Sequence, residues 1–160
     1  MKKIAMIGAG SMAEALLSGM VRKNIIGKDR IWVTNRSNRE KLESIKNTYG
    51  VNTSYDRKEI VEHADIVILA MKPKDAAEAM EEIRHYLTHR TMIVSLLAGI
   101  TIDTIERLAG KSIPVVRVMP NTSAAIGQSA TAIAFNNQVD EKQKAIVKMM
   151  FDTVGLTVFV

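Results

Sequence analysis

The chain has 160 residues, 47% of them hydrophobic and 24% charged, which is typical of a single folded domain and excludes a disordered segment. It contains no cysteine, which excludes disulfides and thiolate metal sites, and no apolar run of the about 20 residues that a membrane span needs, so we expect a cytoplasmic protein. Its net charge of +5 comes from basic residues scattered among acidic ones, which favours a small anionic ligand over nucleic acid.

The first elements expected are a short buried strand at residues 3–7 and a helix at residues 11–22, with Met12, Ala15, Leu16 and Met20 on its apolar face. The stretch between them, residues 8–13, reads GAGSMA and fits the pattern G-x-G-x-x-G/A. In this pattern the first glycine allows a tight turn, the second lets the backbone approach a pyrophosphate, and the last small residue lets the helix pack on the sheet. The stretch therefore predicts a dinucleotide phosphate at the N-terminus of the helix, the alternative being only a tight turn.

The second strand is expected at residues 30–34 and is followed by a helix with Ser37 as N-cap and Glu40 three residues on, a capping box. An NAD site usually ends this strand with an acidic residue that holds the ribose 2′-hydroxyl. Here Asn35, Arg36 and Ser37 follow the strand, and they can bind a 2′-phosphate instead. NADP(H) is therefore predicted in preference to NAD(H), the alternative being that Arg36 is solvated and Ser37 only caps the helix.

The alternation of strands and helices continues along the rest of the chain. Asp56 is expected to cap a helix that ends near residue 62, and the apolar run at 65–70 is expected to be a central strand. Pro73 stops that strand and fits the first turn of a helix to about residue 86. The later elements expected are strands at 91–95, 114–118, 128–135 and 156–160, a short helix after residue 101, and a helix at 140–151.

This order predicts an α/β fold of the Rossmann type, with a doubly wound, mostly parallel sheet flanked by helices, and one dinucleotide-binding domain over residues 1–160. Ligands of such sheets bind outside the carboxyl ends of the strands. We therefore expect residues 70–73 under the middle of the cofactor, and residues 95–99 and 119–122 beside its nicotinamide.

Candidates for metal binding or acid–base catalysis are few. The three histidines, His63, His85 and His89, lack a metal-ligand spacing, and no Ser/His/Asp set stands out. The catalytic residues are therefore unknown, and Lys72 is only a candidate proton donor.

Five motifs along the chain are informative when taken together. They are IGAGSMAEAL at residues 7–16, NRS at 35–37, AMKP at 70–73, SLLAGI at 95–100 and VRVMPNTSAAIGQSAT at 116–131. Together they resemble the N-terminal part of the pyrroline-5-carboxylate reductase family. Met71, Leu97 and Ser123 depart from that family's usual Val, Ala and Pro.

The resemblance implies hydride delivery from NADPH to the C=N bond of 1-pyrroline-5-carboxylate, a small-molecule substrate, to give L-proline in the last step of proline biosynthesis. It also implies a helical C-terminal domain that this chain lacks, and a homo-oligomer only where that domain is present. Because the chain ends on an apolar run, we expect a further segment in the native gene product. The residue patterns and the resemblance together predict that the cofactor is bound by Ile7, Gly8, Gly10, Ser11, Met12, Asn35, Arg36, Ser37, Ala70, Met71, Lys72, Pro73, Ala98, Gly99 and Asn121.

Two alternatives remain open at this point. One is another NADP-dependent dehydrogenase, of the β-hydroxyacid or prephenate type, although the run Met119-Pro120-Asn121-Thr122 is typical of the reductase. The other is a non-enzymatic module that senses NADP.

Overall fold

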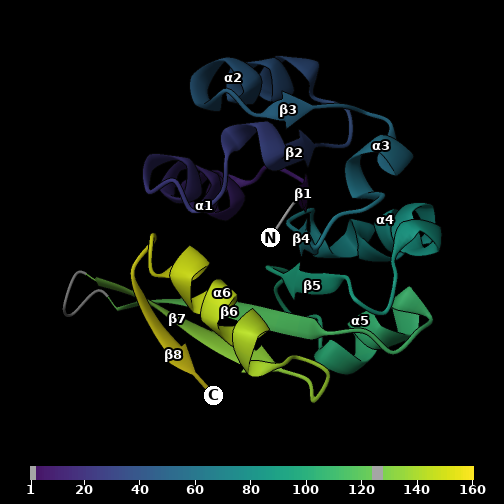
Figure 1. Ribbon diagram of the computed structural model, residues 1–160, viewed down its shortest axis with the longest axis vertical. Helices are drawn as coiled ribbons and strands as arrows, with labels where there is room; N and C mark the ends of the chain where they lie inside the picture. Colours follow the sequence, from purple (N-terminus) through teal and green to yellow (C-terminus); the bar gives the residue numbers. More distant parts are fainter. Residues whose placement is uncertain (1–2, 124–127) are drawn as a thin grey trace.

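An eight-stranded sheet crosses the molecule in the order β3-β2-β1-β4-β5-β6-β7-β8 (Figure 1). The structure is a computed structural model and describes residues 3–123 and 128–160. The strands are β1 (Ile4–Ile7), β2 (Ile31–Thr34), β3 (Asn52–Thr53), β4 (Ile66–Leu69), β5 (Met92–Ser95), β6 (Val115–Ser123), β7 (Gln128–Phe135) and β8 (Leu156–Phe159). The α-helices are α1 (Ser11–Arg22), α2 (Arg39–Tyr49), α3 (Arg57–Val61), α4 (Ala76–Ile83), α5 (Ile102–Ala109) and α6 (Glu141–Phe151). Three short 3₁₀ turns are η1 (Lys28–Arg30), η2 (Pro73–Asp75) and η3 (Arg84–Tyr86).

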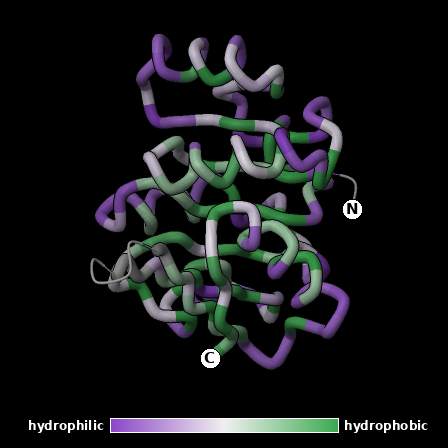
Figure 2. Tube along the Cα trace, turned by 90° about the vertical axis from the view of Figure 1, so that its left-hand side faces the viewer, coloured by the Kyte–Doolittle hydropathy of each residue, from purple (hydrophilic) through white to green (hydrophobic). Residues whose placement is uncertain are grey.

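The sheet is parallel except between β6 and β7, which confirms the expected Rossmann-type fold. Every residue of β1, β4 and β5 is buried, because helices cover both faces of these central strands. Figure 2 shows the hydrophobic stretches gathered inside the molecule and many of the hydrophilic ones at the outer turns and helices.

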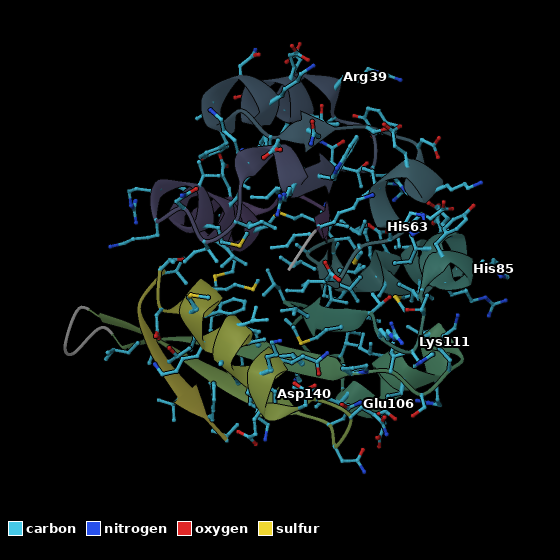
Figure 3. The ribbon with its side chains drawn as sticks, in the orientation of Figure 1. Arg39, His63, His85, Glu106, Lys111 and Asp140 are labelled. Carbon is cyan, nitrogen blue, oxygen red and sulfur yellow. The ribbon has the colours of Figure 1, made fainter. Side chains whose placement is uncertain are left out.

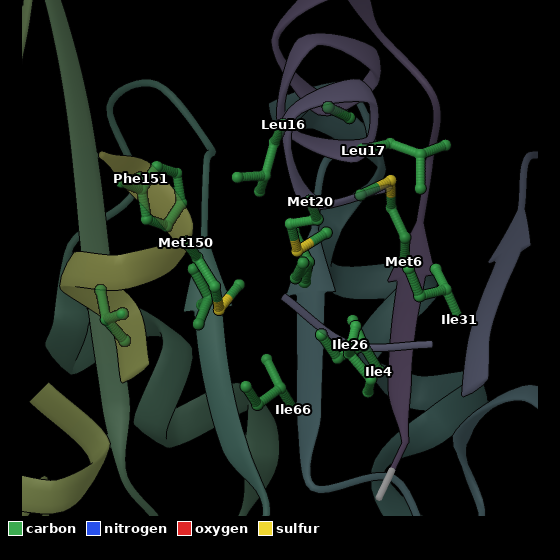
Figure 4. Packing of buried hydrophobic residues seen from close by; sticks show 14 of the residues in the cluster. Ile4, Met6, Leu16, Leu17, Met20, Ile26, Ile31, Ile66, Met150 and Phe151 are labelled. Carbon is green, nitrogen blue, oxygen red and sulfur yellow. The ribbon is translucent and has the colours of Figure 1, made fainter. Parts of the chain in front are cut away.

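Two hydrophobic clusters lie on opposite faces of the sheet. One contains residues of α1, α2 and α6, and the other contains residues of α3, α4 and α5. In the first, Leu16, Leu17 and Met20 of α1 lie near Met6 of β1, as Figure 4 shows.

The buried face of α1 agrees in part with the one expected, since Leu16 and Met20 are buried. It consists of Ala13, Leu16, Leu17 and Met20, whose spacing of i, i+3, i+4 and i+7 forms one stripe of a helix. Ala15 falls outside this stripe and is exposed, so its expected place in the core was wrong.

The start of α2 also differs from the expectation. The N-cap is Asn38, whose side chain accepts a hydrogen bond from the Lys41 backbone N–H at 3.0 Å, so the expected capping box of Ser37 and Glu40 was wrong. Asparagine caps a helix as well as serine does, and the helix therefore starts after it. The hydroxyl of Ser37 is left outside the cap, on an exposed residue.

Three further differences concern element boundaries. The helix expected from Pro73 to about residue 86 is confirmed in extent, but its two ends are the 3₁₀ turns η2 and η3. The two-residue strand β3 was not expected. β6 continues five residues beyond the expected end at Val118, because its second half pairs with β7 as an antiparallel ribbon. None of the helices in the described part of the chain is long and apolar enough to cross a membrane.

Candidate functional site

The carboxyl ends of the parallel strands form one row at an edge of the sheet. In the strand register Ile7 lies opposite Thr34 on one side and Leu69 on the other. Leu69 lies opposite Ser95, which lies opposite Arg117. The loops that leave β1, β2, β4 and β5 therefore start side by side, which is the place where open α/β sheets bind ligands.

Gly8 makes the turn out of β1, with a φ of +102°. Its N–H donates to the Thr34 carbonyl at 2.8 Å, and a Cβ added to it would lie 2.5 Å from the carbonyl carbon of Ala70. Only glycine fits this position, since a side chain would clash with backbone and also adopt a strained conformation. The close contact between the β1 turn and the end of β4 therefore depends on Gly8.

The N-terminus of α1 opens away from this turn. Its N-cap is Gly10, which is exposed and makes no side-chain capping bond, and Ser11 is also exposed. A Cβ added to Gly10 would meet no other heavy atom within 4 Å, so the space beside this residue at the start of the helix is open. The first N–H groups of the helix have no intrahelical acceptor and carry the positive end of the helix dipole. They fit a phosphate group, whereas the half-buried Met12 packs its side chain against the core.

Glu14, in the first turn of α1, accepts hydrogen bonds from the Lys41 ammonium at 2.6 Å and from the Tyr49 hydroxyl at 3.0 Å. The hydrogen bond from Lys41 is the main reason that the pKa of Glu14 lies below its usual 4.5, and partial burial opposes it. Burial and the contact with Glu14 raise the pKa of Tyr49. The group ties α2 to α1, and Lys41 balances the carboxylate charge beside the open helix end.

The loop after β2 presents Arg36. Its shape is set by Asn35, whose side-chain oxygen accepts from the Tyr55 hydroxyl at 2.8 Å and whose amide donates to the Asn38 carbonyl at 2.7 Å. The Arg36 side chain is 69% exposed, and its Nη1 lies 3.2 Å from Oδ1 of Asp75, at the end of η2. The loop thus holds a guanidinium one strand away from the β1 turn.

A hollow of about 50 Å³ lies between the end of β1, the loop after β2 and the start of α4. Five of the residues predicted for cofactor binding meet there, and five further residues were not predicted. The predicted ones are Ile7, Gly8, Asn35, Arg36 and Met71, and the others are Arg57, Asp75, Glu78, Ala79 and Glu82.

Arg57 is a second guanidinium beside this hollow and was missed in the sequence. Its Nε donates to Glu82 at 2.9 Å, its Nη1 to the Thr34 hydroxyl at 2.6 Å, and its Nη2 to the Asn35 carbonyl at 3.5 Å. Arg57 is the first residue of α3, directly after the cap Asp56, so in the sequence it resembles an ordinary helix-start residue. No local signal indicates that it reaches back to the end of β2.

The other predicted residues lie along the same edge or beyond it. Ala70 is half-buried, and Lys72, Pro73, Ala98 and Gly99 are exposed in the loops after β4 and β5.

Asn121 was expected beyond the end of the strand at residues 114–118, but it lies within β6, where it pairs with Ala130. It is four residues beyond Arg117, or about 13 Å along the strand. Residues 124–127, within the last of the five motifs, lie outside the described residues.

The histidines lie away from this edge. His63 follows α3 and His85 lies in η3, so both are at the amino ends of β4 and β5, where Figure 3 labels them on the outside of the molecule. No group of three or more metal-ligating side chains is present in residues 3–123 and 128–160.

The chain is similar to known oxidoreductases. Residues 3–99 match the family described as "NADP oxidoreductase coenzyme F420-dependent". Pyrroline-5-carboxylate reductase 2 of Bacillus subtilis is 45% identical over 155 residues, which are 97% of this chain and 55% of the relative. The chain thus spans about half the length of the curated relatives it matches.

Solved structures of two reductases superpose on nearly the whole chain. A pyrroline-5-carboxylate reductase from Coxiella burnetii superposes with a TM-score of 0.90 at 35% identity, over 99% of this chain and 58% of that one. The pyrroline carboxylate reductase of Plasmodium falciparum, solved with NADP bound, superposes with a TM-score of 0.81 at 26% identity, over 99% of this chain and 57% of that one.

Proposed function

Because the chain belongs to the family described as NADP oxidoreductase, coenzyme F420-dependent, and corresponds within it to the N-terminal domain of the pyrroline-5-carboxylate reductases, we propose that it is the cofactor-binding half of such a reductase. In this proposal residues 1–160 form one domain that binds NADP(H) in preference to NAD(H). The reaction is the reduction of the C=N bond of 1-pyrroline-5-carboxylate to L-proline.

One observation carries the cofactor proposal: the open N-terminus of α1 and the Arg36 guanidinium lie over neighbouring strands of the same edge. The first supplies backbone N–H groups for a pyrophosphate beside Gly8 and Gly10. The second supplies a fork of donors for a 2′-phosphate, with the free hydroxyl of Ser37 beside it. NADP(H), an adenine dinucleotide with a third phosphate, would bind to both the helix N-terminus and the guanidinium.

The chemistry when bound is the cofactor's, since the nicotinamide supplies the hydride. The residues of this chain bind the cofactor and orient it. Lys72, Ala98 and Gly99, exposed after β4 and β5, are proposed to border the path from the pyrophosphate to the nicotinamide, with Asn121 farther out on β6. The pyrroline carboxylate and the homo-oligomer contacts are proposed to need the part of the relatives that this chain does not span.

Titration of the chain with NADPH and with NADH, followed by cofactor fluorescence, tests the cofactor proposal. We expect tighter binding of NADPH, and we expect Arg36→Glu to reverse the preference, because a carboxylate repels the 2′-phosphate and accepts from a 2′-hydroxyl. Lys142→Glu makes the same charge change at an exposed position of α6 and should leave the preference as it is. Equal, weak binding of NADPH and NADH would contradict the proposal.

The proposed reaction is tested by NADPH oxidation with 1-pyrroline-5-carboxylate. The assay compares this chain alone with the chain joined to the C-terminal half of the Bacillus subtilis relative. Turnover only in the joined protein supports the cofactor half of a reductase. NADPH binding without turnover in either protein would favour a sensing module or a dehydrogenase with another substrate.

A further inference from the structure

Two ion pairs join the β2 side of the hollow to α4. Arg36, in the loop after β2, meets Asp75, and Arg57, at the start of α3, meets Glu82. Since β1 lies between β2 and β4, both pairs cross the region over the end of β1, where Gly8 and the hollow are. Both pairs join an arginine to a carboxylate of the helical segment formed by η2 and α4, yet they differ in how firmly each arginine is held.

Arg57 is fixed in its position. Its side chain is 22% exposed, and its three nitrogens donate to Glu82, to the Thr34 hydroxyl and to the Asn35 carbonyl. To turn toward a ligand it would have to give up hydrogen bonds in a partly buried place, which is costly. Arg57 therefore supports the end of β2.

Arg36 is held loosely. Its side chain is 69% exposed, and a single nitrogen, Nη1, lies within hydrogen-bond distance of Asp75, at 3.2 Å. The Asp75 side chain is 22% exposed. A pair with one largely exposed partner and a single hydrogen bond contributes little, because solvent screens the guanidinium and the long side chain loses freedom. The guanidinium can therefore exchange one anion for another with little loss.

Asp75 is suited to such an exchange. It is the last residue of η2, in the first turn of the helical segment that continues through α4. A carboxylate there is stabilised by the positive end of the helix dipole. Its charge therefore remains compensated when Arg36 turns away.

We propose that Asp75 is a specificity-determining residue that occupies Arg36 in competition with the 2′-phosphate of NADP(H), and so limits the preference of the chain for the phosphorylated cofactor. This inference rests on the proposed function, since it assumes that Arg36 receives the 2′-phosphate. Binding of NADP(H) then replaces the Asp75 carboxylate by a phosphate on the same guanidinium. NAD(H), which lacks this phosphate, leaves the pair intact.

The test measures dissociation constants of NADPH and NADH for the 160-residue chain and its Asp75→Asn variant. Asparagine keeps the shape of the side chain and removes the charge. We expect Asp75→Asn to tighten NADPH binding about three- to fivefold, the upper part of the range that a surface ion pair spans, and to change NADH binding less than about twofold. Thermal unfolding of both proteins reports whether the fold is kept.

Two controls separate the ion pair from a general effect of charge. Glu81→Gln removes one negative charge from an exposed position of α4 outside the hollow, and should change either affinity less than about twofold. In an Arg36→Ala background, Asp75→Asn should no longer tighten NADPH binding, because the guanidinium for which the two anions compete is gone.

The outcomes distinguish this inference from the proposed function. If the unchanged chain binds neither nucleotide, both fail. If it prefers NADPH but Asp75→Asn leaves the preference as it was, or acts equally in the Arg36→Ala background, only the inference is overturned. Weaker NADH binding with unchanged NADPH binding would also overturn it, since Asp75 would then bind the ribose hydroxyl.

Discussion

The two ends of the sheet are built differently. On the side of β1 to β5, helices cover both faces, and every residue of β1, β4 and β5 is buried. On the side of β6 to β8, the buried residues of β7, Thr131 and Ile133, belong to the face that α6 covers. On the other face, Leu156, Val158 and Val160 are 57%, 52% and 73% exposed.

This difference explains where the candidate site lies. A loop that carries binding groups needs a rigid base, and strands buried on both faces supply it. All the residues that line the hollow come from the end of β1, the loops that follow β1, β2 and β4, and the helical segments α3, η2 and α4. On the β6–β8 side, the proposed site residue Asn121 lies on a strand that continues past the common edge.

Gly8→Ala should have the largest effect, because it acts on the base of the site. The new Cβ would meet the backbone of Ala70 at 2.5 Å and would force alanine to a φ of +102°. We expect a loss of about 3 to 5 kcal/mol from strain and overpacking together, and loss of NADPH binding. Urea unfolding and cofactor titration measure the two effects.

Gly10→Ala is the matched control. At Gly10 the φ is −72° and the added Cβ meets nothing within 4 Å, so stability should change by less than about 1 kcal/mol. NADPH binding should weaken about tenfold, because the methyl group occupies the space over the helix N-terminus. Equal loss of stability in the two variants would contradict the different roles of the glycines.

The parallel side of the fold was predicted well because its signals are local. The apolar runs of β1 and β4, the cap Asp56 and Pro73 in the first turn of a helical segment are each visible within a few residues, and each is confirmed. The order of strands and helices then leaves few topologies, since parallel crossovers have one hand.

The parts that were missed depend on residues far apart in the sequence. Arg57 contacts Thr34, 23 residues away, and Arg36 contacts Asp75, 39 residues away, so neither contact has a local pattern. The choice between Ser37 and Asn38 as the cap of α2 was also beyond local rules, since both residues are good caps. The extension of β6 depends on its pairing with β7.

The open face of β8 predicts a difference between two small truncations. Ile133→Val removes one buried methyl group from β7 and should cost about 1 kcal/mol of stability. Val158→Ala removes two methyl groups from the open face of β8, where Val158 pairs with Ala132. Its side chain is 52% exposed, so this variant should cost less than about 0.5 kcal/mol. Urea unfolding compares the two, provided that both variants keep the same m-value.

A cost for Val158→Ala as large as that for Ile133→Val would show that β8 is covered in solution. The comparison drawn between the two sides of the sheet would then be wrong. A concentration-dependent unfolding midpoint would identify a second copy of the chain as the cover, because association stabilises by mass action.

A small, pH-dependent effect is expected from Glu14→Gln, between α1 and α2 on the parallel side. The pKa of Glu14 lies below 4.5 in the folded chain, mainly because of the hydrogen bond from Lys41. The ionised form therefore stabilises the fold above the pKa of the unfolded chain, and this contribution is lost as the pH falls through the folded value. Since the Glu14 and Lys41 side chains are 32% and 38% exposed, the contribution at pH 7 should stay below about 1 kcal/mol.

Urea unfolding of the chain and of Glu14→Gln at pH 7 and at about pH 2 measures this contribution, and the difference in stability should disappear at the lower pH. Glu43→Gln, at an exposed position of α2, is the control and should show no difference at either pH. A difference that persists in acid would mean that the Tyr49 hydroxyl and packing, not the charge of Glu14, hold α2 to α1. The stability of the contact between α1 and α2 would then not depend on the ionisation of Glu14, and protonation of Glu14 should leave NADPH binding unaffected.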